Sequence, residues 1–130
     1  VLVREATGKT LVDYLSEKVW APYGMEAKGT WLLSPDGEEI SGCCIQATTR
    51  DFARFGQFFL DGAEVNGESI VPEGWTAKAT SPLYSTHYEG QSYGYQWWIN
   101  DADSFEAMGI FGQGIFIDHK RTMTADDKIN

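Results

Sequence analysis

The sequence predicts an α+β fold, in which helices come first and antiparallel strands follow. Two segments, 11–21 and 51–60, repeat apolar residues at the spacing of a helix. From Tyr93 onward apolar residues alternate with a period of two, as in a strand with one buried face. No internal repeat occurs, and no linker rich in Gly, Ser or Pro divides the 130 residues. We therefore expect one domain with its own core.

The first helices are bounded by residues that start and stop helices. Residues 1–7 resemble the end of a helix that stops at Gly8, so the chain looks truncated at its amino end. Thr10 can cap the next helix, and Pro22 ends it. The residues at helical spacing on this second helix are Leu11, Tyr14, Leu15 and Val19.

The middle of the chain combines a turn signal with a longer helix. The Pro-Asp-Gly sequence at 35–37 separates two short extended segments, which predicts a hairpin. Thr48, followed three residues later by Asp51, has the form of a capping box before the helix over 51–60. A proline opens a shorter helix over 72–80. The apolar stripe of the longer helix is Phe52, Phe55 and Phe59, widened by Phe58 and Leu60.

Two antiparallel strands complete the predicted elements. The alternation over 93–99 places Tyr93, Tyr95, Trp97 and Ile99 on one face. A turn at 100–104 leads into a second strand over 105–118, and the two form a hairpin. Residues 119–130 lack such a period and are expected to form a polar tail.

The second strand is interrupted by Gly109, Gly112 and Gly114. Glycine in a strand packs no side chain and costs roughly 0.5 to 1 kcal/mol relative to alanine. Such positions either let another group approach the backbone or mark a bulge or a tightly covered sheet. In the first case a main-chain N–H can point at an oxyanion, and spacing alone leaves both interpretations open.

The charge of the chain disfavours nucleic acid as a partner. The formal net charge is −9, and the acidic residues are scattered rather than gathered in a tail. Affinity for nucleic acid comes largely from neutralising phosphates, which an acidic surface opposes. No window approaches the roughly 18 to 20 consecutive apolar residues of a membrane span.

The two cysteines, Cys43 and Cys44, are adjacent. Neighbouring residues of an extended segment point to opposite sides, so we expect two free thiols rather than a bridge. Free thiols favour a reducing compartment, which slightly favours the cytoplasm over the periplasm. His87 and His119 are far apart in sequence, so no zinc pattern is recognised and no metal or organic cofactor is expected.

Motifs for a nucleophile are missing from these residues. No G-x-S-x-G elbow occurs, and no Ser is followed three residues later by Lys. Gly8, Lys9 and Thr10 look like the end of a phosphate-binding loop, but Val3 stands where that loop needs a glycine. A helix stop followed by a cap explains these three residues better.

The order of several segments resembles the serine hydrolases related to class C β-lactamases and penicillin-binding proteins. Within them the chain is most similar to the 6-aminohexanoate-dimer hydrolase (nylon-oligomer hydrolase) branch. The likeness covers residues 1 to about 118, as a C-terminal part of the β-lactamase/transpeptidase-like fold, and leaves 119–130 as an atypical tail. The segments that carry it are ATGKTLVDYLSEKVWAPYGM, SGCCIQATTRDFARFGQFFL, IVPEGW, YGYQWWIN and FEAMGIFGQGIFID.

The resemblance implies a serine hydrolase that cleaves an amide or ester of a small molecule through an acyl-enzyme. It places the catalytic Ser and Lys of an S-x-x-K helix, and the Tyr of a Y-x-N loop, before Val1. The family's K-T-G or H-x-G triplet matches Ala107, Met108 and Gly109 here. Because position 107 lacks the cation, β-lactamase activity itself is in doubt.

The resemblance also suggests roles around that triplet. Gly109 would allow close approach, and the N–H of Ile110 would join the nucleophile's own N–H in the oxyanion hole. Trp97, Tyr95 and Phe111 are candidates for the wall of an apolar substrate cleft, or else for the core. Gln113 would orient a substrate amide or pair with the backbone. The alternative function is a catalytically inactive relative that binds a peptide or cell-wall fragment.

Overall fold

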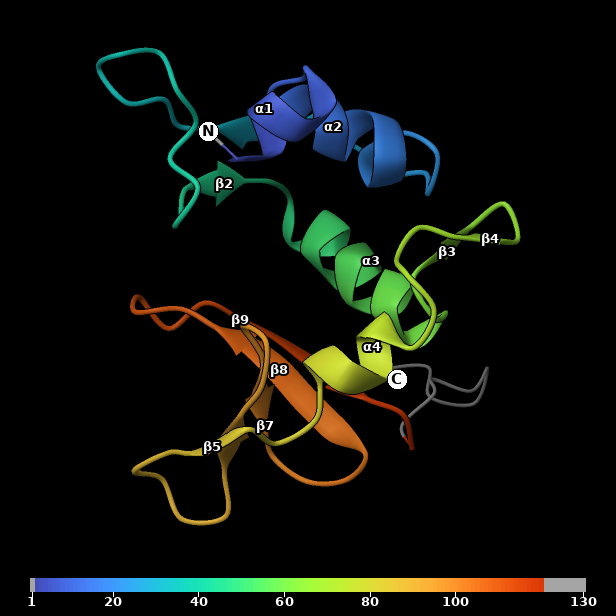
Figure 1. The fold of residues 1–130 in the computed structure, drawn as a ribbon, viewed down its shortest axis with the longest axis vertical. Helices are drawn as coiled ribbons and strands as arrows, with labels where there is room; N and C mark the ends of the chain where they lie inside the picture. The colour runs from blue at the N-terminus through green and yellow to red at the C-terminus, as the bar shows by residue number, and fades with distance from the viewer. Residues whose placement is uncertain (1, 121–130) are drawn as a thin grey trace, which may run out of the picture. The chain divides into compact units, whose positions relative to one another are not determined.

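The computed structural model describes residues 2–120 (Figure 1). These residues fall into two compact units, which are considered separately. The first comprises residues 2–55 and 64–70, and the second comprises residues 56–63 and 71–120. Helices and antiparallel strands occur in both units, in agreement with the predicted α+β class.

The first unit opens with helices that begin and end where the sequence predicts. α1 (Leu2–Thr7) is followed by Gly8, whose φ of +69° is the left-handed conformation of a helix stop. α2 (Leu11–Leu15) is capped by Thr10, whose Oγ1 accepts from the N–H of Asp13 at 3.1 Å. The helix then widens into a π-helical turn, η1 (Ser16–Trp20), a change that the apolar spacing does not predict.

A short hairpin follows in the same unit. β1 (Thr30–Trp31) pairs antiparallel with β2 (Ile45–Gln46), and a bridge between Leu33 and Glu39 extends the pairing toward the turn. Gly37 has a φ of +81° and donates its N–H to the carbonyl of Ser34 at 2.9 Å. The predicted hairpin around 35–37 is therefore confirmed.

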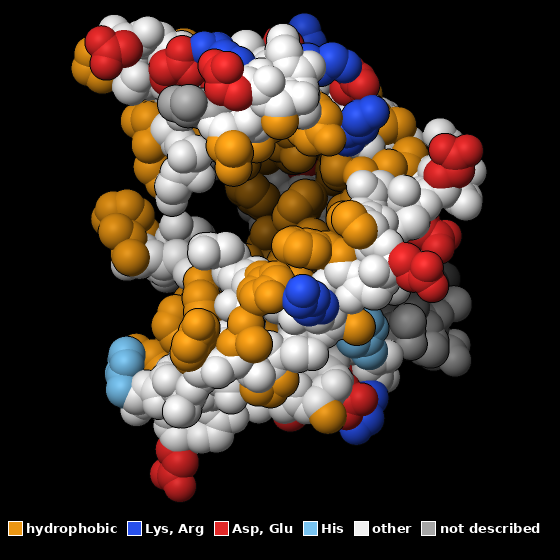
Figure 2. Space-filling model, in the orientation of Figure 1, with side chains coloured by type: hydrophobic (Ala, Val, Ile, Leu, Met, Phe, Trp, Pro, Cys, Tyr) orange, Lys and Arg blue, Asp and Glu red, His pale blue; other side chains and the backbone are white. Residues whose placement is uncertain are grey.

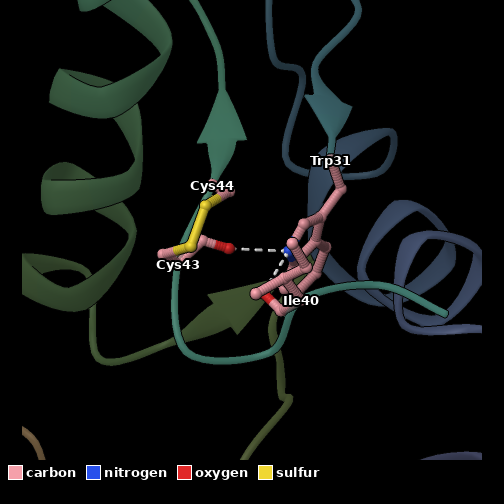
Figure 3. Close-up of a disulfide and its surroundings, with 4 residues drawn as sticks. All are labelled: Trp31, Ile40, Cys43 and Cys44. Carbon is pink, nitrogen blue, oxygen red and sulfur yellow. Dashed lines mark hydrogen bonds between the residues drawn. A yellow bond between two sulfur atoms is a disulfide. The ribbon is translucent and has the colours of Figure 1, made fainter. Parts of the chain in front are cut away.

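The prediction of two free thiols is wrong. Cys43 and Cys44 are joined by a disulfide, with their Cα atoms 3.7 Å apart (Figure 3). The prediction assumed an extended backbone, but Cys44 has a φ of +82°, which turns its side chain toward that of Cys43. The indole Nε1 of Trp31 donates to the carbonyls of Ile40 at 3.0 Å and Cys43 at 2.9 Å. The argument for a reducing compartment rested on free thiols and therefore no longer holds.

α3 (Thr49–Leu60) begins with a buried carboxylate. The N–H of Asp51 donates to Thr48 Oγ1 at 3.1 Å, and that hydroxyl donates to Asp51 Oδ2 at 2.9 Å, which confirms the predicted cap. Asp51 also accepts from the N–H groups of Glu26 at 2.6 Å and Ala27 at 3.1 Å. Burial alone would raise the pKa of this carboxyl, but these hydrogen bonds and the Arg54 guanidinium outweigh it and lower the pKa.

The remaining short elements are a second hairpin in the first unit and a short helix in the second. β3 (Glu64–Val65) and β4 (Glu68–Ser69) form a hairpin, and the residues of its turn, Asn66 and Gly67, both have positive φ. The side chain of Val65 is buried. α4 (Trp75–Ala79) lies inside the segment predicted as a short helix.

The second unit is built around an antiparallel sheet in the order β5-β6-β7-β8-β9 (Figure 1). Ile99, Phe105 and Ile117 form its buried core, and Phe59 and Leu60 pack against them. The strands are β5 (Tyr84–Ser85), β6 (Ser92–Tyr93), β7 (Trp98–Ile99), β8 (Ser104–Met108) and β9 (Gly114–Asp118).

Both strands that the sequence predicts are broken by a turn. Instead of one strand over 93–99, β6 and β7 pair with each other across residues 94–97, where Gln96 has a φ of +66°. The predicted face therefore does not exist, and Tyr93 lies opposite Trp98 with ring centroids 5.0 Å apart. The predicted pairing of the 93–99 and 105–118 segments is confirmed in part, since β7 pairs with β8.

Candidate functional site

The predicted site residues 109–113 form the turn between β8 and β9. The ladder of these strands ends at the pair Met108 and Gly114. The N–H of Gly109 donates to the carbonyl of Gln113 at 2.9 Å, and the N–H of Gly112 donates to that of Gly109 at 3.1 Å. Gly112 has a φ of +80°, which other residues rarely adopt. The predicted strand over 105–118 is therefore two strands, and its glycines belong to a turn and its edge.

The surroundings of Gly109 differ from those of Gly112 and Gly114. A Cβ added at Gly109 would lie well under 3.0 Å from Nε2 and Cδ of Gln113. A Cβ at Gly112 would meet nothing within 4 Å, and one at Gly114 would make an ordinary contact of 3.6 Å. The space above Gly109 is thus occupied by the side chain of Gln113.

The side chain of Gln113 pairs with the backbone of its own turn. Its Oε1 accepts from the N–H of Phe111 at 3.0 Å. This matches one of the two roles that the sequence left open, the pairing with backbone. Gln113 therefore contacts both flanks of Ile110, through Gly109 on one side and Phe111 on the other.

The N–H of Ile110 is left out of this network. Ile110 lies beyond the last ladder pair, and within residues 2–120 its N–H has no hydrogen-bond acceptor. The side chains of Ile110 and Phe111 are 91% and 88% exposed. The turn thus presents an unpaired backbone donor to its surroundings.

Exposed apolar side chains alone do not mark this site. Figure 2 shows hydrophobic side chains at several places on one face of the molecule. Leu2 and Tyr84, far from the turn in sequence, are 83% and 71% exposed. The feature that distinguishes the turn is Gln113, whose side chain fills the space beside Gly109 and accepts from the N–H of Phe111.

The other predicted wall residues lie in different surroundings. Trp97 packs edge-to-face against Phe59 and Phe105, with ring centroids 4.9 and 5.0 Å away, so it contributes to the core. Tyr95 lies against Trp75 with ring centroids 5.5 Å apart. A role for either ring in a substrate cleft stays a prediction.

The turn offers a donor but no group that moves protons. Between 105 and 118 the only titratable side chains are Glu106 and Asp118, and Glu106 accepts from Asn100 Nδ2 at 3.1 Å. Position 107, where the sequence resemblance predicts a cation in related hydrolases, is occupied by Ala107. Within residues 2–120 no group of three or more His, Cys, Asp or Glu is arranged to hold a metal ion. No described helix has the length and apolar character needed to cross a membrane.

Two cavities in the described residues are lined by residues outside the turn. One, of about 280 Å³, belongs to the first unit and is lined in part by Trp20, Trp31 and Ile45. The other, of about 590 Å³, belongs to the second unit and is lined in part by Pro82 and Asn100. Neither is lined by any of the predicted site residues.

Comparisons with known proteins agree with the resemblance seen in the sequence. The family model described as Beta-lactamase matches residues 1–125. Among solved structures, the chain is similar to "Putative 6-aminohexanoate-dimer hydrolase from Bacillus anthracis", with 34% sequence identity and a TM-score of 0.81. The match covers 92% of this chain and 32% of that one, so the chain spans about a third of that hydrolase. No curated protein matches.

Proposed function

Because the chain belongs to the β-lactamase family, we propose that it supplies one half of the oxyanion hole of a serine hydrolase. The donor is the backbone N–H of Ile110. The nucleophilic Ser, its Lys and the Tyr are contributed by other parts of a full-length hydrolase, since residues 1–130 contain no S-x-x-K sequence. The bond cleaved is an amide or an ester.

The position of Ile110 in the turn is the observation that carries this proposal. The amides on either side of it, those of Gly109 and Phe111, both donate to Gln113. An amide held between two fixed neighbours is oriented in advance, which is the property that an oxyanion donor needs.

In the proposed reaction the serine Oγ attacks the substrate carbonyl, and the carbonyl oxygen becomes an oxyanion. The N–H of Ile110 and the N–H of the nucleophile donate to it, so the tetrahedral intermediate is stabilised more than the substrate. Collapse expels the amine or alcohol and leaves an acyl-enzyme, which water then hydrolyses. The Lys and Tyr of the family accept the proton that the serine Oγ loses and return it to the leaving amine or alcohol.

The residues at the triplet offer no partner for a substrate carboxylate. Ala107 provides no cation, and Met108 is uncharged. The name of the Bacillus anthracis protein refers to the 6-aminohexanoate dimer, whose two units are joined by an amide. We therefore propose small amides or esters as the substrate class, recognised without a cation at position 107.

The decisive test removes the backbone donor. Proline at 110 has no N–H, and Ile110 is not among the residues with a positive φ, which proline cannot adopt. Thermal unfolding of the variant checks that the turn is retained. In a full-length hydrolase carrying this chain, Ile110→Pro should lower kcat by about 10² to 10³. The matched control, Ile110→Ala, keeps the N–H and should change kcat by less than about threefold.

Active-site labelling separates the proposal from its alternative. A folded full-length protein should be acylated by a fluorophosphonate or a chromogenic ester. Failure of a correctly folded protein to react would support the catalytically inactive binding relative instead. Full turnover by a folded Ile110→Pro variant would reject Ile110 as the donor.

A further inference from the structure

The three glycines of the FEAMGIFGQGIFID segment are not equivalent, and Gly109 differs from the others by its neighbour. The obstacle to a side chain at 109 is the carboxamide of Gln113, whereas Gly112 is constrained by its own backbone conformation. In this conformation the side chain of Gln113 fills the space beside Gly109, so a ligand cannot occupy that space. The neighbour that requires a glycine at 109 is therefore Gln113 and not a substrate.

Gln113 connects the two ends of the turn. Its carbonyl accepts from Gly109 N–H, and its side-chain Oε1 accepts from Phe111 N–H. Both bonds come from one residue, so the positions of the amides before and after Ile110 are set together. The Gln113 residue itself is exposed, so this role does not depend on burial in the core.

We infer that Gln113 is a positioning residue, which orients the Ile110 N–H toward the oxyanion. We also infer that position 109 requires glycine because a larger residue would displace the Gln113 carboxamide. This inference rests on the proposed function, because it requires Ile110 N–H to be the donor. It assigns Gln113 no contact with the substrate. A displacement of about 1 Å of a group that acts on the transition state lowers rates by up to about a hundredfold. Loss of the hydrogen bonds made by Gln113 should therefore lower turnover.

A double-mutant cycle in the full-length hydrolase tests the pairing. Gln113→Met keeps the approximate length of the side chain but has no Oε1, and Gly109→Ala adds a Cβ where Gln113 Nε2 lies. Each variant should lower kcat about tenfold while KM changes less than twofold. Because each variant disrupts the same Gln113 side-chain interaction, the double variant should be no slower than the slower single variant.

The matched control is Gly114→Ala at the other edge of the turn. Its Cβ would make an ordinary contact of 3.6 Å with Ala107 O, and Gly114 does not have a positive φ. This variant should keep kcat, KM and the melting temperature. It shows that adding a methyl group to this hairpin does not by itself lower turnover.

Specific outcomes overturn the inference. Losses that multiply in the double variant would mean that Gly109 and Gln113 act independently. An unchanged kcat in Gln113→Met, together with a large loss in Ile110→Pro, would reject the positioning role and keep the oxyanion donor. An unchanged kcat in Ile110→Pro would reject the proposed function itself. If Gly109→Ala does not fold, the kcat of Gln113→Met decides alone, because that side chain is exposed.

Discussion

Two glycines, Gly94 and Gly109, interrupt predicted strands of the second unit for opposite reasons. A Cβ at Gly94 would lie well under 3.0 Å from the backbone carbonyl of Ala79 and 3.0 Å from that of Ser81. The three atoms nearest to a Cβ at Gly109 all belong to the side chain of Gln113. Backbone cannot move aside without disturbing the fold, whereas a glutamine side chain can rotate. The two glycines therefore differ in the rigidity of their neighbour, which is backbone at Gly94 and a side chain at Gly109.

Of the variants at these two glycines, Gly109→Val is expected to have the larger effect on turnover. In a full-length hydrolase carrying this chain, Gly109→Val should lower kcat about a hundredfold, because the branched side chain displaces Gln113 and crowds the Ile110 amide. The melting temperature should change little, since the turn is exposed. Kinetics and thermal unfolding of the same preparation check this. Unchanged turnover in a stable variant would remove the distinction drawn between the two glycines.

Gly94 should show the reverse pattern. Gly94→Ala should lower the free energy of unfolding by about 1 to 3 kcal/mol, because the added methyl group collides with backbone carbonyls in a buried position. The molecules that remain folded should keep their kcat. Denaturant unfolding combined with active-site titration measures both quantities. A variant with full stability would show that the 94–97 turn adapts as easily as the 109–113 turn.

A smaller effect is expected at the start of α3, another place where a backbone arrangement depends on one side chain. Thr48→Ala should lower the free energy of unfolding by about 1 kcal/mol at neutral pH, because it removes the cap and a hydroxyl donor to Asp51. The neighbouring variant Thr49→Ala is the control and should change stability by a few tenths of a kcal/mol.

The effect of Thr48→Ala should depend on pH. The folded state lowers the pKa of Asp51, so the stability from this carboxylate is present above its unfolded pKa and is lost as pH falls through the folded pKa. The difference between wild type and Thr48→Ala should therefore shrink below about pH 4. Denaturant unfolding at several pH values checks this. A difference that stayed constant to acid pH would mean that the hydroxyl does not stabilise the carboxylate.

Much of the fold could be predicted because its signals are local. Thr10, Gly8 and the Thr48–Asp51 pair fix helix ends through hydrogen bonds to their own neighbours, and the Pro-Asp-Gly turn does the same for the first hairpin. The family resemblance rests on the order of several such segments, and the match over residues 1–125 confirms it.

The features that could not be predicted depend on contacts between distant residues or on a single backbone angle. The break in the 93–99 segment depends on Ala79, which is far from Gly94 in sequence and supplies the carbonyl that receives the N–H of Tyr95 at 2.8 Å. The disulfide depends on the left-handed conformation of Cys44, for which the residue type gives no signal. The Gln113 contact was one of two open roles, because composition does not say where a carboxamide points.

The disulfide between Cys43 and Cys44 has a consequence for how it acts on the chain. A cross-link restricts the unfolded polypeptide more when it closes a longer loop, and this one closes a ring around a single peptide unit. It therefore leaves the configurational freedom of the unfolded chain almost untouched. Its influence is confined to the geometry of the peptide between the two sulfur-bearing residues, beside the carbonyl that receives the Trp31 indole. It constrains one bend of the chain and does not join separate segments.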